Sequence, residues 1–185
     1  MKPTQNAADG LDGPTFKTGK ASPIHSALVT VSGQRTTLAL GRKVTVVLAM
    51  ATWCKYCAYM DKWVLPPIAK EPGVAVDVID LSPMGGIADP GPRRPAFNGT
   101  DGSVGTFLSQ RGMETAMRLY AAKYGIASSG IHFYVAPTST RQQWHVTAFP
   151  TIIVLNAHRI VALQQARAMT LSQLSAAVDE VAGHQ

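Results

Sequence analysis

The stretch ATWCKYCAYM, residues 51–60, contains the only two cysteines of the chain, Cys54 and Cys57. It follows KVTVVLAM, residues 43–50, a nearly continuous apolar run rich in β-branched residues, which is typical of a strand buried on both faces. From Cys54 onward the apolar residues recur at helical spacing. The sequence therefore predicts that the cysteine pair lies where a buried strand ends and a helix begins.

The helix after the cysteines is expected to turn one face toward the core and to be kinked or stopped by Pro66-Pro67. The residues predicted on that face are Cys57, Met60 or Asp61, Val64, Leu65 and Ile68. VAVDVIDL, residues 74–81, then predicts a second buried strand. Strand, helix and strand in this order are typical of a right-handed parallel unit, so the core is expected to be α/β.

The flanking segments complete the predicted sheet. Residues 27–40 predict a β-hairpin turning at Gly33, and residues 152–165 predict a second hairpin of two apolar strands. The chain is expected to end in a helix that starts after the N-cap residue Thr170, with Gln173 completing a capping box, and that closes at Gly183.

The middle of the chain is harder to interpret. Residues 82–106 are so rich in glycine and proline that no regular element is expected there, although loops of this length are often functional. The spacing of apolar residues from Met113 to Tyr124 predicts a helix, and residues 131–136 are compatible with an added strand.

Composition limits the possible functions. A chain of 185 residues with 46% hydrophobic and 15% charged residues predicts one domain, here residues 26–185, preceded by a flexible leader over residues 1–25. No apolar run approaches the ~18 residues of a membrane span, and the first 20 residues lack the apolar segment of a signal peptide. The net charge is +6, but the basic residues are scattered, which disfavours a nucleic-acid role.

Three functions are possible for the cysteine pair. A structural zinc ion needs four ligands, and the five histidines show no paired spacing, so we predict no metal. A structural disulfide across so short a loop would remove little chain entropy. A redox-active pair needs a thiolate at a helix start, where the unpaired N–H groups lower the pKa of a thiol, and this is where Cys54 stands.

The position of each residue suggests its role in a redox pair. Cys54, in the first turn, is expected to be exposed and nucleophilic, while Cys57 can reach it to form or resolve a mixed disulfide. Lys55 adds a positive charge beside the pair, and Tyr56 is expected to shape the approach of a partner. We predict no cofactor.

The residues also carry a resemblance. TWCKYC after an apolar strand, followed by Phe149-Pro150-Thr151 before a β-hairpin and a final helix, resembles the thioredoxin fold. The segment 31–57 is similar to the start of the TlpA-like periplasmic thioredoxins, a family of thiol-disulfide oxidoreductases. The resemblance implies a central mixed β-sheet flanked by helices, with an N-terminal β-hairpin and an inserted loop-helix segment over residues 82–140.

The resemblance also implies site residues. Trp53 would pack against the active-site turn, and Pro150 would be a cis-proline that faces the disulfide. The backbone of Phe149 and Thr151 would bind an extended client, and the Phe149 ring would contact it.

One position departs from the pattern of the fold. Thioredoxins keep a buried aspartate six residues before the first cysteine, and this chain has Leu48 there. Resolution by Cys57 would then need water or another acid or base, for which Glu71, Asp77 and Asp80 are candidates.

The sequence thus predicts an enzyme, a thiol-disulfide oxidoreductase that exchanges electrons with protein dithiol or disulfide clients and with a membrane or soluble partner that recycles it. A reductase is favoured over a DsbA-like oxidase. A rival of another class is a copper-binding or scaffold protein of the cell envelope, with Met60 or His145 assisting the thiolates. Two cysteines that form a redox pair suit an oxidising compartment, so a periplasmic location is expected, with the cytoplasm as the alternative.

Overall fold

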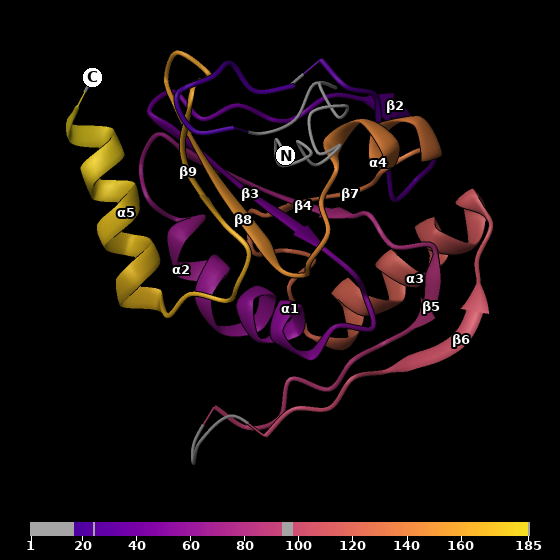
Figure 1. Ribbon diagram of the computed structural model, residues 1–185. Coiled ribbons are helices and arrows are strands. Elements are labelled where there is room, and N and C mark those ends of the chain that lie inside the picture. Colours follow the sequence, from indigo (N-terminus) through magenta and orange to yellow (C-terminus); the bar gives the residue numbers. More distant parts are fainter. Residues whose placement is uncertain (1–16, 24, 94–97, 185) are drawn as a thin grey trace, which may run out of the picture.

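The computed structural model describes residues 17–23, 25–93 and 98–184, and within them a seven-stranded mixed sheet forms the centre of the molecule (Figure 1). The strand order is β2-β1-β7-β4-β3-β8-β9. The strands are β1 Leu28–Thr30, β2 Arg35–Thr36, β3 Val44–Met50, β4 Val74–Asp80, β7 His132–Val135, β8 Thr151–Asn156 and β9 Val161–Gln165. The predicted α/β class, with its mixed sheet and N-terminal hairpin, is confirmed.

The two central strands fix the position of the cysteines. β3 pairs with β4 in parallel and with β8 antiparallel, and every residue of β3 is buried. This burial on both sides explains the unbroken apolar run of its sequence. Because β3 ends at Met50, the chain leaves the middle of the sheet directly into the cysteine segment.

Helices cover the two faces of the sheet unequally (Figure 1). One face carries the cysteine helix, α3 Gln110–Lys123 and α5 Leu171–Gly183, which enclose the larger core. The other face carries α4 Thr138–Trp144 and the loops around β1 and β2, which enclose a smaller core that includes Trp144 and Leu38. The predicted capping box of Thr170 and Gln173 at the start of α5 is present.

The cysteine helix has three parts. α1 spans Lys55–Tyr59, a π-helical turn η1 spans Met60–Val64, and α2 spans Leu65–Ile68. The helix does not stop at Pro66-Pro67, which occupy the first turn of α2, where a missing N–H is tolerated. It widens just before them, because the N–H of Leu65 bonds to the carbonyl of Met60 five residues earlier.

The structure corrects the expectation that residues 82–106 contain no regular element. β5 Met84–Gly86 and β6 Ser103–Phe107 pair antiparallel, and Asp89 and Thr100 exchange two backbone hydrogen bonds of 3.0 and 2.8 Å further along. We call residues 84–93 and 98–107 the arm. A Cβ on Gly86 would lie 1.7 Å from the carbonyl oxygen of Gly102, so glycine permits this close pairing.

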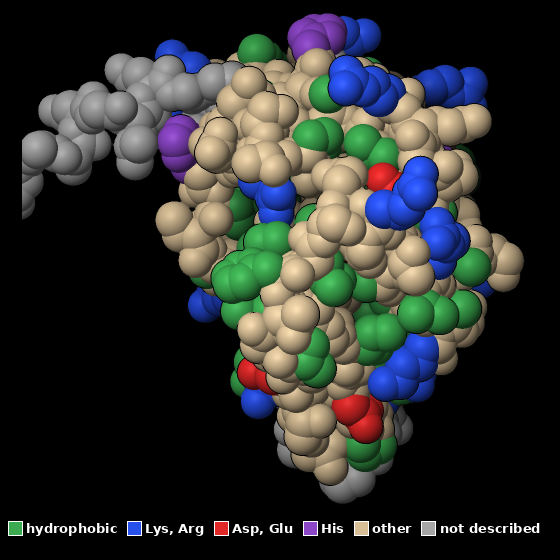
Figure 2. All heavy atoms as spheres, turned by 90° about the vertical axis from the view of Figure 1, so that its right-hand side faces the viewer, with side chains coloured by type: hydrophobic (Ala, Val, Ile, Leu, Met, Phe, Trp, Pro, Cys, Tyr) green, Lys and Arg blue, Asp and Glu red, His purple; other side chains and the backbone are tan. Residues whose placement is uncertain are grey.

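The arm and α3 form one side of the molecule. Figure 2 shows hydrophobic side chains gathered on this side, and three of the large ones are exposed there: Val104, Phe107 and Leu119. α3 and β7 follow the predicted helix and strand closely, and β7 extends the main sheet beside β4. Helix α4 was not predicted, because its seven residues, TSTRQQW, are mostly polar and too few to show a periodicity.

The described part of the predicted leader contacts the sheet. The N–H of Gly19 bonds to the carbonyl of Val161 at 2.7 Å, and that of Ser22 to the carbonyl of Arg159 at 2.9 Å. Residues 1–16 lie outside the described residues, so the leader stays a prediction there. Across the part of the chain that is described, no helix has the length and apolar character needed to cross a membrane.

Candidate active site

Cys54 is the N-cap residue of α1, and its Sγ accepts a hydrogen bond of 3.3 Å from the backbone N–H of Cys57. Interaction with the Cys57 side chain, together with backbone N–H groups of the first turn, lowers the pKa of Cys54 below its ordinary value, against the opposing effect of burial. Burial, followed by the neighbouring Cys54 sulfur, raises the pKa of Cys57 well above its ordinary value. The two thiols are free and unlike: one favours the thiolate and the other holds its proton.

The expectation that Cys54 is exposed is wrong. Its residue exposure is 4% and that of Cys57 is 0%. The arm, which the sequence did not predict, passes beside the cysteine turn: the N–H of Gly102 bonds to the carbonyl of Trp53 at 2.9 Å, and that of Ala88 to the carbonyl of Thr52 at 2.9 Å. These bonds hold the two edges of the arm against the residues just before Cys54.

The arm also contributes a charge to the site. Asp101 accepts a hydrogen bond of 3.0 Å at Oδ1 from the backbone N–H of Lys55, in the first turn of α1. Its negative charge is a minor influence that raises the pKa of Cys54. Local sequence patterns do not predict this contact, because the partners are 46 positions apart and the arm itself was not expected.

Trp53 joins the cysteine turn to two other segments. Its Nε1 donates a hydrogen bond of 2.9 Å to Oγ of Ser82, at the end of β4. Its ring meets that of Phe149 edge to face, with 6.3 Å between centroids. Two predicted site residues that are 96 positions apart in the chain are therefore in contact.

The segment predicted to lie opposite the cysteines leads into β8. The Phe149-Pro150 peptide bond is cis, and Pro150 is buried. Thr151 is buried and begins β8 opposite Ala49 of β3, with its Oγ1 donating to the carbonyl of Ala148 at 2.8 Å. Phe149 is partly buried.

Lys55 and Tyr56 lie at the surface beside the pair. The Lys55 Nζ stands 5.3 Å from the centroid of the Tyr56 ring, a cation–π contact. Tyr56 is 46% exposed. Its exposure agrees with the predicted role in shaping the approach of a partner, a role that stays a prediction.

A buried carboxylate, Asp61, lies one helical turn beyond Cys57 with 0% exposure, and its Oδ2 accepts a hydrogen bond from the hydroxyl of Tyr120 on α3. Burial raises the pKa of Asp61 to about 8, while the tyrosine opposes that shift. The helical spacing placed either Met60 or Asp61 on the buried face, and the structure buries both.

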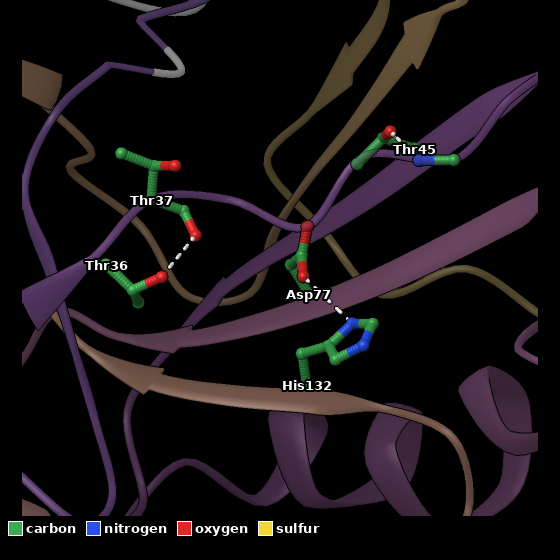
Figure 3. Close-up of polar contacts among 6 residues, drawn as sticks. Thr36, Thr37, Thr45, Asp77 and His132 are labelled. Carbon is green, nitrogen blue, oxygen red and sulfur yellow. Dashed lines mark hydrogen bonds and ion pairs between the residues drawn. The ribbon is translucent and has the colours of Figure 1, made fainter. Parts of the chain in front are cut away.

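The acids that the sequence suggested lie elsewhere. Asp77 points to the opposite face of the sheet, where its Oδ1 lies 3.2 Å from Nδ1 of His132 (Figure 3). Asp80 accepts a 2.9 Å hydrogen bond from the N–H of Ser82, and Glu71 lies in the turn before β4. None of these three appears among the charges that shift the pKa of either cysteine.

The two sulfur atoms could also hold a soft metal ion, the alternative raised from the sequence. Within the described residues, no group of three or more histidine, cysteine or acidic side chains is placed to hold a metal. The Sδ of Met60 is buried and accepts a bond of 3.3 Å from the N–H of Met169. Copper binding stays a prediction.

Comparison with solved structures identifies the fold. DsbF of MTB, solved in mixed oxidized and reduced forms, matches with a TM-score of 0.59 and 17% identity over 85% of this chain and 96% of that one. A secreted Mycobacterium tuberculosis disulfide oxidoreductase homologous to Escherichia coli DsbE matches with a TM-score of 0.56 and 16% identity over 85% and 96%.

A thioredoxin-like protein from Aeropyrum pernix matches with a TM-score of 0.57 and 20% identity over 83% of this chain and 88% of that one. A scan against protein-family models and a search of the curated proteins found no match. The solved structures therefore place the chain in the thioredoxin-like fold, with its cysteine pair at the start of the helix that follows a central strand.

Proposed function

We propose that the protein is a thiol-disulfide oxidoreductase in which Cys54 attacks and Cys57 resolves. The observation that carries this proposal is the N-cap position of Cys54, where its sulfur accepts the Cys57 N–H and its pKa is lowered. A thiolate is the nucleophile of disulfide exchange, and the thiol with the lower pKa is the one that attacks.

The exchange balances without a cofactor. The Cys54 thiolate attacks one sulfur of a client disulfide, forming a mixed disulfide and releasing the other client sulfur as a thiolate. Cys57 then loses its proton and attacks the Cys54 sulfur, so that the internal disulfide forms and the second client thiolate leaves. Two electrons pass from the cysteine pair to the client, and the reverse sequence oxidises a client dithiol.

The groups around the pair suit a polypeptide client. The exposed ring of Tyr56 lies beside the pair, the ring of Phe149 meets that of Trp53 next to Cys54, and the cis peptide at Pro150 precedes the strand β8. The likeness of residues 31–57 to the TlpA-like thioredoxins favours the reductase direction, with a DsbA-like oxidase as the alternative. A recycling partner would then restore the dithiol.

A periplasmic location fits this proposal. The chain has a redox pair and no other cysteine, as suits an oxidising compartment where stray thiols are avoided. One of the similar structures is described as a secreted disulfide oxidoreductase.

The test is the redox potential of the cysteine pair, measured by equilibration with glutathione and dithiothreitol buffers, together with reduction of a protein disulfide such as that of insulin. A value near roughly −270 mV would support a reductase, and one near roughly −120 mV an oxidase. Cys54→Ser should abolish exchange in both directions. Exchange that survives this substitution would overturn the proposal.

A further inference from the structure

Asp61 occupies a position from which it can serve Cys57. It stands four residues after Cys57 in the same continuous helix, a spacing that places two side chains on one helix face. Both residues are 0% exposed: Cys57 belongs to the larger core, and Asp61 contacts Tyr120, which belongs to the same core. The electrostatic influence of Asp61 reaches the sulfur of Cys57, and that of Cys54 reaches Asp61.

The hydrogen bonding of Asp61 is incomplete for a purely structural carboxylate. Oδ2 accepts from the Tyr120 hydroxyl, whereas Oδ1 is buried without a hydrogen-bond partner among the described residues. A buried charge without a cation is costly, so structural carboxylates in cores are normally paired and fully hydrogen-bonded. The free oxygen leaves Asp61 able to bind or release a proton.

The π turn begins where the acid lies. Within η1, Met60, Asp61 and Val64 are all buried. Met60 faces α5, where its sulfur meets the N–H of Met169 at the entry to that helix, while Asp61 faces Tyr120 of α3. Such turns are frequent at functional sites.

We propose that Asp61 exchanges a proton with the Cys57 thiol during disulfide exchange, with Tyr120 orienting its carboxylate. In the resolving step the Asp61 carboxylate takes the Cys57 proton, the Cys57 thiolate attacks the Cys54 sulfur, and the client thiolate leaves. In the reverse direction protonated Asp61 returns the proton to Cys57. The inference rests on the proposed function. It assigns to Asp61 the proton transfer that would otherwise need an acid on β3, where this chain has Leu48.

Among the described residues, the titratable groups that interact with Asp61 are Cys54 and Cys57 at the start of its own helix, Tyr120 of α3, and Tyr124 at the C-cap of α3. Burial raises the pKa of Tyr124 to about 12 and that of Tyr120 well above its ordinary value, so both phenols keep their protons at neutral pH. In the resolving step the Cys54 sulfur is bonded in the mixed disulfide and carries no proton, so Asp61 is the group beside the pair whose charge changes near pH 8.

The test separates the two thiol steps. The reduced protein is mixed with 5,5′-dithiobis(2-nitrobenzoate), a small aromatic disulfide, in a stopped-flow instrument. The first equivalent of coloured thiolate reports attack by Cys54, and the second reports resolution by Cys57. In Asp61→Asn the second phase should slow about 10-fold to 100-fold at pH 7, whereas the first should stay within about threefold.

The pH dependence distinguishes proton transfer from a structural effect. In the wild type the rate of the second phase should rise with an inflection near pH 8, and Asp61→Asn should lose that inflection. Tyr120→Phe removes the hydrogen bond that favours the carboxylate, so it should move the inflection to higher pH. If Asp61→Asn does not fold, the Tyr120→Phe profile decides.

Asp77→Asn is the matched control, because it also removes a fully buried carboxylate, but on the opposite face of the sheet. It should leave both phases and their pH profiles unchanged. A second phase that Asp61→Asn does not slow, or an inflection that Tyr120→Phe does not move, overturns the inference. Neither result would affect the proposed function, which fails instead if the wild type shows no first phase and reduces or oxidises no protein disulfide.

Discussion

Two aspartates, Asp61 and Asp77, are fully buried on opposite faces of the same sheet, and their surroundings differ. Asp61 faces a tyrosine and two thiols, none of which carries a positive charge. Asp77 faces His132, whose side chain is 47% exposed and whose pKa is raised chiefly by its 3.2 Å contact with that carboxylate. Figure 3 shows the imidazole pointing toward Asp77 from the neighbouring strand β7.

The difference teaches how one fold can use a buried acid in two ways. At Asp77 the histidine supplies the opposing charge and moderates the rise in the pKa that burial causes, so the pair serves the stability of the sheet. At Asp61 burial acts against only a neutral hydroxyl, and the pKa reaches about 8. Asp61, which has no cation beside it, has a proton available near neutral pH.

The largest expected effect is on the stability of Asp61→Asn. The pKa of Asp61 is raised from 3.8 to about 8, so between these values the folded state binds more protons than the unfolded state, and the free energy of unfolding falls as the pH rises. The cumulative loss is on the order of 5 kcal/mol by pH 9, and it should be absent from Asp61→Asn.

Urea unfolding of both proteins at pH 5, 7 and 9 measures this difference. Relative to the wild type, Asp61→Asn should gain stability at each step to higher pH. A difference between the two proteins that stays constant with pH would show that Asp61 does not titrate in this range, and its contrast with Asp77 would be lost.

The second-largest expected effect concerns His132, the cationic partner that Asp77 has and Asp61 does not. His132→Ala should lower the free energy of unfolding by about 1–3 kcal/mol near pH 6, because it leaves the buried Asp77 without its cation. Above the raised pKa of His132 the imidazole loses its charge, and in acid Asp77 gains a proton, so the cost should shrink on both sides.

The same urea series at pH 4, 6 and 9 tests this bell-shaped dependence, and Lys20→Ala, at the opposite edge of the sheet beside β9, is a control for loss of an exposed cation. If the stability lost in His132→Ala instead rises steadily with pH, Asp77 titrates in the way expected of Asp61.

The sequence predicts the helices and strands better than it predicts the surroundings of Asp61 and Asp77. The strand β3, the turn at Cys54 and the cap at Thr170 follow from local patterns, and the structure has them where expected. Asp61 was visible as an alternative to Met60 on the helix face, but its partner Tyr120, 59 positions away on α3, was not.

Contacts between distant residues were not predictable in the same way. Gly86 and Gly102 read as loop residues, whereas in the structure their missing side chains allow two strands of the arm to pair. Asp101 reaches α1 only because of that pairing. The partnership of Asp77 with His132 requires knowing that β4 and β7 are neighbours, which composition and spacing do not show.

The smallest expected effect concerns the charge that the arm places at the start of α1. Asp101→Asn keeps an oxygen that can accept from the N–H of Lys55 but removes the negative charge that raises the pKa of Cys54. The pKa of Cys54 should therefore fall, and the first phase of the aromatic disulfide reaction at pH 6 should quicken by up to about threefold. Asp89→Asn, elsewhere on the arm, is the control and should leave that rate unchanged.

Because Asp101 is exposed, salt should erase the difference, whereas the effect of the buried Asp61 on the second phase should persist at high salt. Equal salt sensitivity of the two effects would place Asp61 in contact with solvent and remove the basis of its raised pKa.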